Sequence, residues 1–229
     1  LNTAVADELM QFADELEKAD NFEAALSTLI RRELAAHRRI LFNGNGYSEE
    51  WPREAARRGL LNLRSTPEAL IHYTDEKNVA LFARHGVYTR TEIQSRQDIN
   101  MEEYAKIIHI EALTLIDMLG KLIVPACAAY SKQLAEGVAA KAGIGVDAPA
   151  EAAQVRLLTE KTAELIERTE RLKAVVAAEP EALNARAMYE HEAVIPAMEA
   201  ARQVADELEG RVGKEYWPMP SYADLLFYV

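Results

Sequence analysis

Residues 155–176 read VRLLTEKTAELIERTERLKAVV. Its apolar and small side chains recur at alternating steps of three and four residues, which is the spacing of a coiled-coil seam. The seam positions are Val155, Leu158, Thr162, Leu165, Thr169, Leu172 and Val176. A helix that carries one such stripe must bury it against another helix. The stretch therefore predicts a long helix with a helical partner.

A second heptad pattern follows in the same chain and supplies that partner. Its seam positions are Ala187, His191, Val194, Met198, Ala201, Ala205, Leu208 and Val212. Glu179-Pro180 lies between the two patterns and is expected to form the turn. Four heptads that face four heptads predict an antiparallel coiled-coil helical hairpin.

The rest of the sequence is also helical in pattern. Apolar residues recur at helical spacing over 5–41 and again over 91–122. The pairs Ser65–Glu68 and Thr89–Glu92 match the capping box, which marks the start of a helix. No stretch alternates with period two for long enough to predict a strand. The predicted class is all-α, a helical bundle with a long antiparallel coiled-coil helical hairpin.

We expect three parts along the chain. Residues 1–146 form a helical domain, residues 147–212 form the antiparallel helical arm, and residues 213–229 form an aromatic tail. The first boundary follows from Gly143 and Gly145, because glycines tolerate loop conformations. The tail is rich in aromatic residues and prolines, so we expect it to fold back on a core. Docking onto a neighbouring domain or subunit is the alternative.

Pro125 interrupts the long helical pattern that begins near Thr91. Proline has no backbone N–H and its ring clashes with the carbonyl four residues earlier. We therefore expect the helix to kink or end at this residue.

The net charge indicates which kinds of binding partner to expect, and the cysteine content indicates which cellular compartment. The formal net charge of −11 argues against nucleic acid and against an anionic membrane surface as partners. The most apolar stretch, residues 107–124, contains four titratable side chains and is not expected to span a bilayer. The single Cys127 excludes an intramolecular disulfide framework and fits a reducing cytoplasm. We expect a cytoplasmic protein with no nucleic-acid or membrane partner.

The histidines lack the spacing of a known metal motif. A di-iron bundle needs Glu-x-x-His twice. The residues three before the five histidines are Leu34, Ala69, Phe82, Lys106 and Met188. No His-x-x-x-His or Cys-x-x-Cys occurs either. We interpret His109 and His191 as hydrogen-bonded core histidines and Cys127 as a small buried apolar residue, and we predict no metal ligand.

Two features could in principle bind an anion. The loop Gly44-Asn45-Gly46 precedes a predicted helix, but it has no Gly-Lys-Ser/Thr and no preceding strand. The basic concentrations are Arg31-Arg32, Arg38-Arg39, Arg53 and Arg57-Arg58. We interpret them as solvated faces paired with local acids such as Glu33 and Glu54, with an acidic partner surface as the alternative. We predict no catalytic and no cofactor-binding residue.

The stretch from Ile40 onward resembles a known family. It reads ILFNGNGYSEEW at 40–51, EAARRGLLNL at 54–63 and STPEAL at 65–70. This closely resembles the stretch that follows the catalytic core in type III glutamine synthetases. The likeness continues in NVALFARHGV at 78–87, Glu103-Tyr104, IEALT at 110–114 and the tail YWPMP at 216–220. It covers nearly the whole chain, most specifically positions 40–87 and 214–229.

The start of the chain fits the same resemblance. Leu1-Asn2-Thr3 resembles the boundary between the catalytic domain of the family and the helical segment that follows it. The chain begins without methionine and is in a helical pattern within a few residues. We therefore expect an excised segment.

The resemblance implies a full-length enzyme that joins ammonia to glutamate with ATP and magnesium or manganese, through a γ-glutamyl phosphate. It also implies a large assembly of stacked hexameric rings. The metal-binding glutamates, nucleotide pocket and glutamate-binding arginines of the family lie upstream in a strand-rich catalytic domain. The resemblance therefore assigns no catalytic, cofactor-binding or metal-binding residue to this chain.

The expected role is structural. Residues 1–146 would pack on the catalytic domain and the arm 147–212 would meet other subunits of a homo-oligomer, while the chain alone would be inactive and without cofactor. One alternative is a stand-alone helical adaptor that binds partner helices through the arm. Another is an all-α enzyme whose arginines near Gly44 hold a small anionic substrate.

Overall fold

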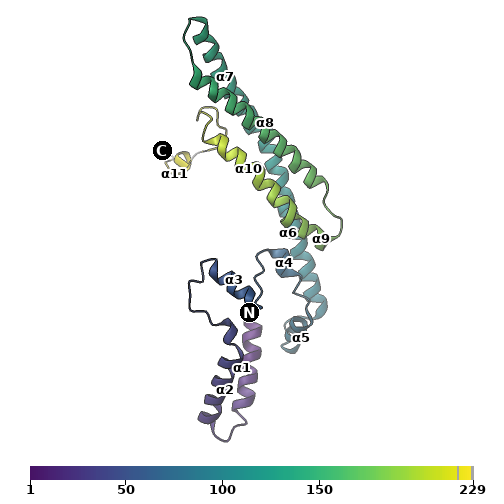
Figure 1. The fold of residues 1–229 in the computed structure, drawn as a ribbon. Helices are drawn as coiled ribbons and strands as arrows, with labels where there is room; N and C mark the ends of the chain where they lie inside the picture. The colour runs from purple at the N-terminus through teal and green to yellow at the C-terminus, as the bar shows by residue number, and fades with distance from the viewer. Residues whose placement is uncertain (221, 228–229) are drawn as a thin grey trace. The chain divides into compact units, whose positions relative to one another are not determined.

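The structure is a computed structural model that describes residues 1–220 and 222–227 (Figure 1). Within these residues every regular element is a helix and no strand occurs, so the predicted all-α class is confirmed. The chain divides into two compact units, Leu1–Met101 and Glu102–Val229. The division falls inside the long helix α6 (Arg90–Met118). No helix among the described residues is both long and apolar enough to cross a membrane.

The first unit contains short and medium helices. They are α1 (Asn2–Leu16), α2 (Phe22–Ala36), the 3-10 turn η1 (Arg38–Ile40), α3 (Glu50–Arg57), α4 (Thr66–Leu70), α5 (Glu76–Arg84) and the start of α6. Helices α1 and α2 lie side by side (Figure 1). Asn21 caps α2 by accepting a hydrogen bond from the Ala24 N–H at 3.1 Å.

The helix starts of the first unit follow the predicted caps. At α4, Ser65 Oγ accepts from the Glu68 N–H and the Glu68 carboxylate accepts from the Ser65 N–H at 2.9 Å. Thr89 and Glu92 make the same reciprocal pair before α6. Both predicted capping boxes are therefore confirmed.

Two helices of this unit end at glycines in the left-handed conformation. Gly59 has φ 70° after α3, and Gly86 has φ 61° after α5. In each case the next residue donates its N–H to the carbonyl five residues back, Leu60 to Ala55 and Val87 to Phe82. This is the Schellman motif. A residue with a Cβ would be strained in the left-handed backbone conformation that the motif requires.

A buried carboxylate joins α1 to α5. Asp7 accepts hydrogen bonds from Arg84 at 2.7 and 2.8 Å and from His85 Nε2 at 2.9 Å. Gln11 donates a further one at 3.0 Å. The bonds from His85 and then Arg84 hold the pKa of the Asp7 carboxyl below its ordinary value. This cluster fixes the first helix against one that lies more than seventy residues further along the chain.

The second unit is built from longer helices. After α6 come the π-helical turn η2 (Leu119–Ile123), α7 (Val124–Gly143), α8 (Pro149–Ala177), α9 (Leu183–Tyr189), the π-helical turn η3 (Glu190–Val194), α10 (Ile195–Glu209) and α11 (Tyr222–Leu226). Helix α8 lies alongside both α7 and α10 (Figure 1). It is therefore the central helix of this unit.

Most of the predicted seam residues are buried. On α8 they are Leu158, Leu165, Thr169, Leu172 and Val176, and on the returning segment they are Ala187, Val194, Ala201, Ala205, Leu208 and Val212. One core joins Leu158, Leu165 and Leu208 with Leu119, Ile123 and Cys127 from the preceding helices. Residues 147–212 therefore share their core with residues before 146. The boundary predicted at 146/147 lies in the α7–α8 loop, inside the second unit.

The sequence led us to expect a kink or an end of the helix at Pro125. The structure instead has a π-turn before this proline, and a helix continues after it. In this π-turn, η2, the Val124 N–H is bonded to the Leu119 carbonyl, and the chain continues as α7. A π-turn shifts hydrogen bonding to five-residue spacing, which moves the preceding carbonyls away from the proline ring. Pro196 repeats the arrangement, since η3 precedes it and the Ile195 N–H bonds to Glu190.

The start of the aromatic tail packs on the second unit. Tyr216 and Trp217 contact the core around Leu158 and Leu208, and the rings of Tyr216 and Tyr130 lie 5.3 Å apart. Residues 221, 228 and 229 of the predicted tail lie outside the described residues.

The Asp7 cluster gives a pH-dependent prediction. We expect Asp7→Asn to lower the melting temperature at pH 7, because the neutral amide loses charge-assisted hydrogen bonds from Arg84 and His85. A carboxyl with a lowered folded pKa stabilises the fold above its unfolded pKa, 3.8, and this contribution disappears as the pH falls through the folded pKa. The difference in melting temperature between variant and parent should therefore shrink at pH 3, as circular dichroism can measure. The exposed Asp14→Asn is the control, and an equal deficit at both pH values would contradict the assignment.

The core around α8 gives a second prediction. Leu165 is fully buried, while the adjacent Ile166 is 46% exposed. We expect Leu165→Ala to reduce the free energy of unfolding by about 2–5 kcal/mol, because it leaves a cavity among packed side chains. Ile166→Ala removes a similar side chain from the surface and should cost far less. Urea unfolding of both variants tests this, and equal losses would show that α8 is not the central helix.

Candidate functional site

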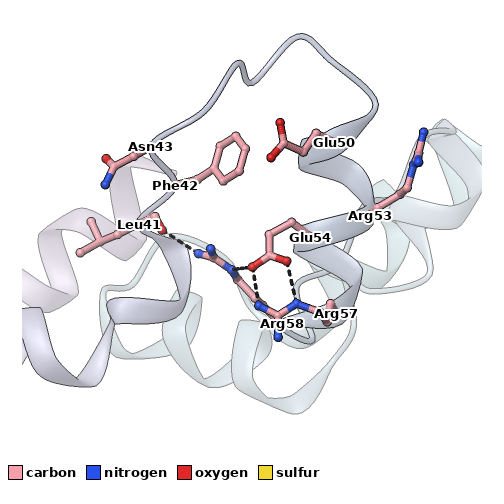
Figure 2. Close-up of a pocket in the computed structure, with 8 residues that line it drawn as sticks. All are labelled: Leu41, Phe42, Asn43, Glu50, Arg53, Glu54, Arg57 and Arg58. Carbon is pink, nitrogen blue, oxygen red and sulfur yellow. Dashed lines mark hydrogen bonds and ion pairs between the residues drawn. The ribbon is translucent and has the colours of Figure 1, made fainter.

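A pocket lies in the first unit, where the segment after η1 faces helix α3 (Figure 2). Its volume is about 670 Å³. The lining residues are Leu41, Phe42, Asn43, Glu50, Arg53, Glu54, Arg57 and Arg58. An adjoining pocket adds Arg38 and Arg39. Arg38 and Arg39 are thus brought near the predicted arginines of α3. Arg31 and Arg32 line neither pocket, and Arg32 pairs with Glu15 and Glu33.

The centre of this pocket is a carboxylate with two guanidinium partners. Arg57 donates to both oxygens of Glu54 at 2.6 Å, and Arg58 Nε donates to Glu54 Oε1 at 2.6 Å (Figure 2). Hydrogen bonds from Arg57 first and Arg58 second lower the pKa of Glu54 to about 2. Two of the five arginines around the pocket therefore already have an anionic partner.

Arg58 also holds the loop in place. Its Nη1 donates to the backbone carbonyls of Arg39 at 3.0 Å and Leu41 at 2.6 Å. Its guanidinium carbon lies 5.8 Å from the centre of the Trp51 ring, on which Phe42 packs at 4.6 Å. Arg58 is therefore a structural residue. Arg53 points away from Glu54 in Figure 2 and has no ion pair with any described residue.

The Gly44-Asn45-Gly46 loop uses its polar groups internally. The Asn45 side chain accepts from the Tyr47 N–H at 3.0 Å, and the Asn45 carbonyl accepts from the Ser48 hydroxyl at 2.8 Å. The N–H of Tyr47 is therefore engaged within the loop itself.

Cys127 and His191 have different surroundings. Cys127 is fully buried in the core, and its burial raises the pKa of the thiol. His191, a predicted seam residue, is only half-buried. Its neighbour Glu190 takes the fully buried position instead. Glu190 comes three residues after the buried Ala187 and four before the buried Val194, which is the spacing of one helix face.

His109 belongs to a cluster of charged side chains in the second unit. Its Nδ1 lies 2.5 Å from Glu179 Oε1, and Arg186 Nη2 donates to the other oxygen of Glu179 at 2.8 Å. One ligand atom from each of His109, Glu179 and Glu190 lies within 4.8 Å of the other two. Burial first, and the neighbouring Glu179 second, raise the pKa of Glu190 to about 7.

Sequence reasoning missed this cluster because its members come from α6, the turn after α8, and η3. The signal that could have pointed to it is Glu190, which lies at helical spacing between Ala187 and Val194. A carboxylate on an apolar stripe needs a partner.

The sequence has clear relatives among known proteins. The family model described as "Glutamine synthetase C-terminal domain" matches residues 25–142. The chain is 35% identical over 217 residues, 91% of its length, to a glutamine synthetase of Butyrivibrio fibrisolvens. It is 35% identical over 238 residues, 99% of its length, to the type-3 glutamine synthetase of Dictyostelium discoideum. A glutamine synthetase of Bacteroides fragilis is 32% identical over 244 residues, again 99% of this chain.

The chain spans 30–33% of the length of these relatives. The pocket around Glu54 lies inside the matched range 25–142, as does His109. The chain therefore belongs to the type III glutamine synthetases, and its residues correspond to their helical C-terminal domain.

Proposed function

We propose that this chain is a structural and assembly segment of a glutamine synthetase, which in its full-length form joins glutamate and ammonia with ATP in the cytoplasm. The segment itself takes no catalytic part and binds neither ATP nor the catalytic magnesium or manganese. Two facts support the proposal, namely the family and the share of the relatives that the chain spans. The observation that carries it is the apolar surface of the first unit.

Helices α1 and α2 bury little of their apolar surface. Five large apolar side chains on them are about half exposed: Val5, Leu9, Phe22, Ile30 and Leu34. The two helices together bury only Asp7 and Leu29. Amphipathic helices are stable when such a face packs on another element, and exposed apolar patches of this kind mark interaction surfaces. We propose that the catalytic part of the synthetase covers this face.

The segment around the Glu54 pocket also carries exposed apolar side chains. Tyr47 is fully exposed and Leu61 is 71% exposed. Arg38, Arg39 and Arg53 lie close by, so a partner surface with apolar and acidic groups would fit here. Because Arg57 and Arg58 are held by Glu54, this arrangement favours a docking surface over a pocket for a small anion.

The second unit offers a different kind of contact. We propose that α8 with α9–η3–α10 acts as an antiparallel coiled-coil hairpin that, supported by α7, reaches other subunits of a homo-oligomer. The α7–α8 loop at one end carries Ile144, which is 79% exposed, and Val146, which is 48% exposed. Apolar residues at the tip of a long helical pair are suited to such a contact.

The docking face can be tested in the full-length synthetase that contains this segment. Leu34→Asp places a charge where we propose an apolar contact, and burial of an unpaired charge is costly. We expect the fraction of assembled enzyme and the ligase activity of the variant each to fall by more than about tenfold. Size-exclusion chromatography and an activity assay would measure these two quantities. Ala35→Asp adds the same charge at the next, exposed residue of the helix and should change neither.

In the isolated chain, analytical ultracentrifugation should show self-association that Leu34→Asp weakens. A Leu34→Asp synthetase with normal assembly and activity would place the contact elsewhere. A strictly monomeric chain at high concentration would favour the stand-alone adaptor.

The alternative hypothesis, that this chain is an all-α enzyme for a small anionic substrate, can be tested by calorimetry with ATP, glutamate and inorganic phosphate. We expect no saturable micromolar binding, because Arg57 and Arg58 already donate hydrogen bonds to the Glu54 carboxylate. Glu54→Gln removes the carboxylate that would compete with an added anion for Arg57 and Arg58. This variant is therefore the control in which anion binding would be easiest to detect. Micromolar binding to the parent chain, strengthened by Glu54→Gln, would overturn the claim that the segment is non-catalytic.

A further inference from the structure

Glu190 is a carboxylate without a hydrogen-bond partner among the described residues. It lies in η3, is fully buried, and neither of its oxygens accepts a hydrogen bond from a described residue; its neighbour is another carboxyl group, that of Glu179. A buried polar group left in this state costs several kcal/mol, more when it is charged. Such a group in a well-packed helical unit points to a ligand that completes it.

The oxygens of Glu190 face two further potential ligands. A nitrogen of His109 and an oxygen of Glu179 lie within 4.8 Å of the Glu190 carboxylate and of each other. Glu179 is almost buried, with 9% of its side chain exposed, while His109 keeps 29%. The three side chains thus bring their ligand atoms together at a place where His109 is the most exposed of them.

We propose that His109, Glu179 and Glu190 bind one divalent transition-metal ion, with zinc the best fit. An imidazole nitrogen and two carboxylates form a mixed N/O donor set that suits zinc, with manganese weaker by the Irving–Williams order. Magnesium and calcium prefer oxygen ligands alone, so they fit less well. The ion would connect α6, the turn after α8, and η3, which gives it a structural role in the second unit.

The charges agree with a divalent cation. Two carboxylates approach each other here, and Arg186 pairs with only one of them, through Glu179 Oε2. The Arg186 Nε is itself buried without an acceptor among the described residues. A dication that bridges both carboxylates satisfies Glu190 without disturbing the Arg186–Glu179 pair.

The geometry needs only a local adjustment. Ligand atoms about 2.0–2.1 Å from a tetrahedral zinc lie about 3.3 Å apart. His109 and Glu179 are now at hydrogen-bond distance, 2.5 Å, so the ion would replace the shared proton and the pair would open slightly. Glu190 would move toward them, and a water molecule on the exposed side of His109 would be the fourth ligand.

The test uses the full chain, stripped with a chelator and titrated separately with zinc, manganese and magnesium chlorides in a calorimeter. We expect one equivalent of zinc, weaker manganese binding, and no magnesium binding. Glu190→Gln and His109→Gln should each weaken zinc binding by at least about a hundredfold, since loss of even an outer partner costs 10–100-fold. Glu192→Gln and His191→Gln, which change neighbouring residues outside the cluster, are matched controls and should bind as the parent does.

Two further measurements keep the proposal falsifiable if one variant folds poorly. Cobalt(II) in place of zinc should give visible d–d absorption bands of a low-coordinate N/O site in the parent and not in His109→Gln, whose side chain is partly exposed and tolerant of change. Zinc should also raise the melting temperature of the parent but not of Glu190→Gln. Absence of stoichiometric zinc binding would overturn the proposal, as would zinc binding that survives both substitutions. This outcome is independent of the assembly role, which the Leu34→Asp synthetase tests.

Discussion

The apolar stripe of α8 is the constraint on which the second unit depends. It runs along a helix of 29 residues, and Leu158, Leu165 and Leu172 on it are fully buried. One neighbouring helix covers only part of such a stripe, and each exposed leucine would lose about 1.5–3 kcal/mol of burial free energy. Helices α7 and α10 both pack on α8, which explains why the predicted two-helix arm shares its core with earlier residues.

The two π-turns are the consequence of keeping that packing in the presence of prolines. Pro125 and Pro196 would each disrupt an α-helix, yet α7 and α10 must remain continuous with the helices before them to cover α8. Widening the turn before each proline solves the steric problem and inserts one residue. Glu190 lies within η3 and is fully buried, while the predicted seam residue His191 next to it is half-buried.

The sequence predicted what depends on nearby residues. The all-α class, the capping boxes at Ser65 and Thr89, and the buried leucines of α8 follow from spacings of three or four residues, and the structure has all of them. The pairing of Arg57 with Glu54 is equally local. The Asp7–Arg84 pair and the His109–Glu179 pair join residues 77 and 70 positions apart, and nothing in their local sequence specifies the partner. The two π-turns were missed because a proline indicates a disturbed helix but does not specify the form of the disturbance.

The family model matches residues 25–142, a range that includes both the exposed apolar stretch of the first unit and part of the second unit's core. The second unit buries its own stripes, and many sequences with a heptad pattern could do the same. The stretch around Phe42, Tyr47 and Leu61 instead leaves much of its apolar surface exposed, with only a few polar contacts such as those of Arg58 to hold it. The side chains of such a surface are constrained by the partner surface that they contact and not by packing within their own unit. Residues that match a partner surface tolerate fewer alternatives than residues that fill a generic helical seam, which is why an exposed stretch such as 40–63 can still have a specific sequence.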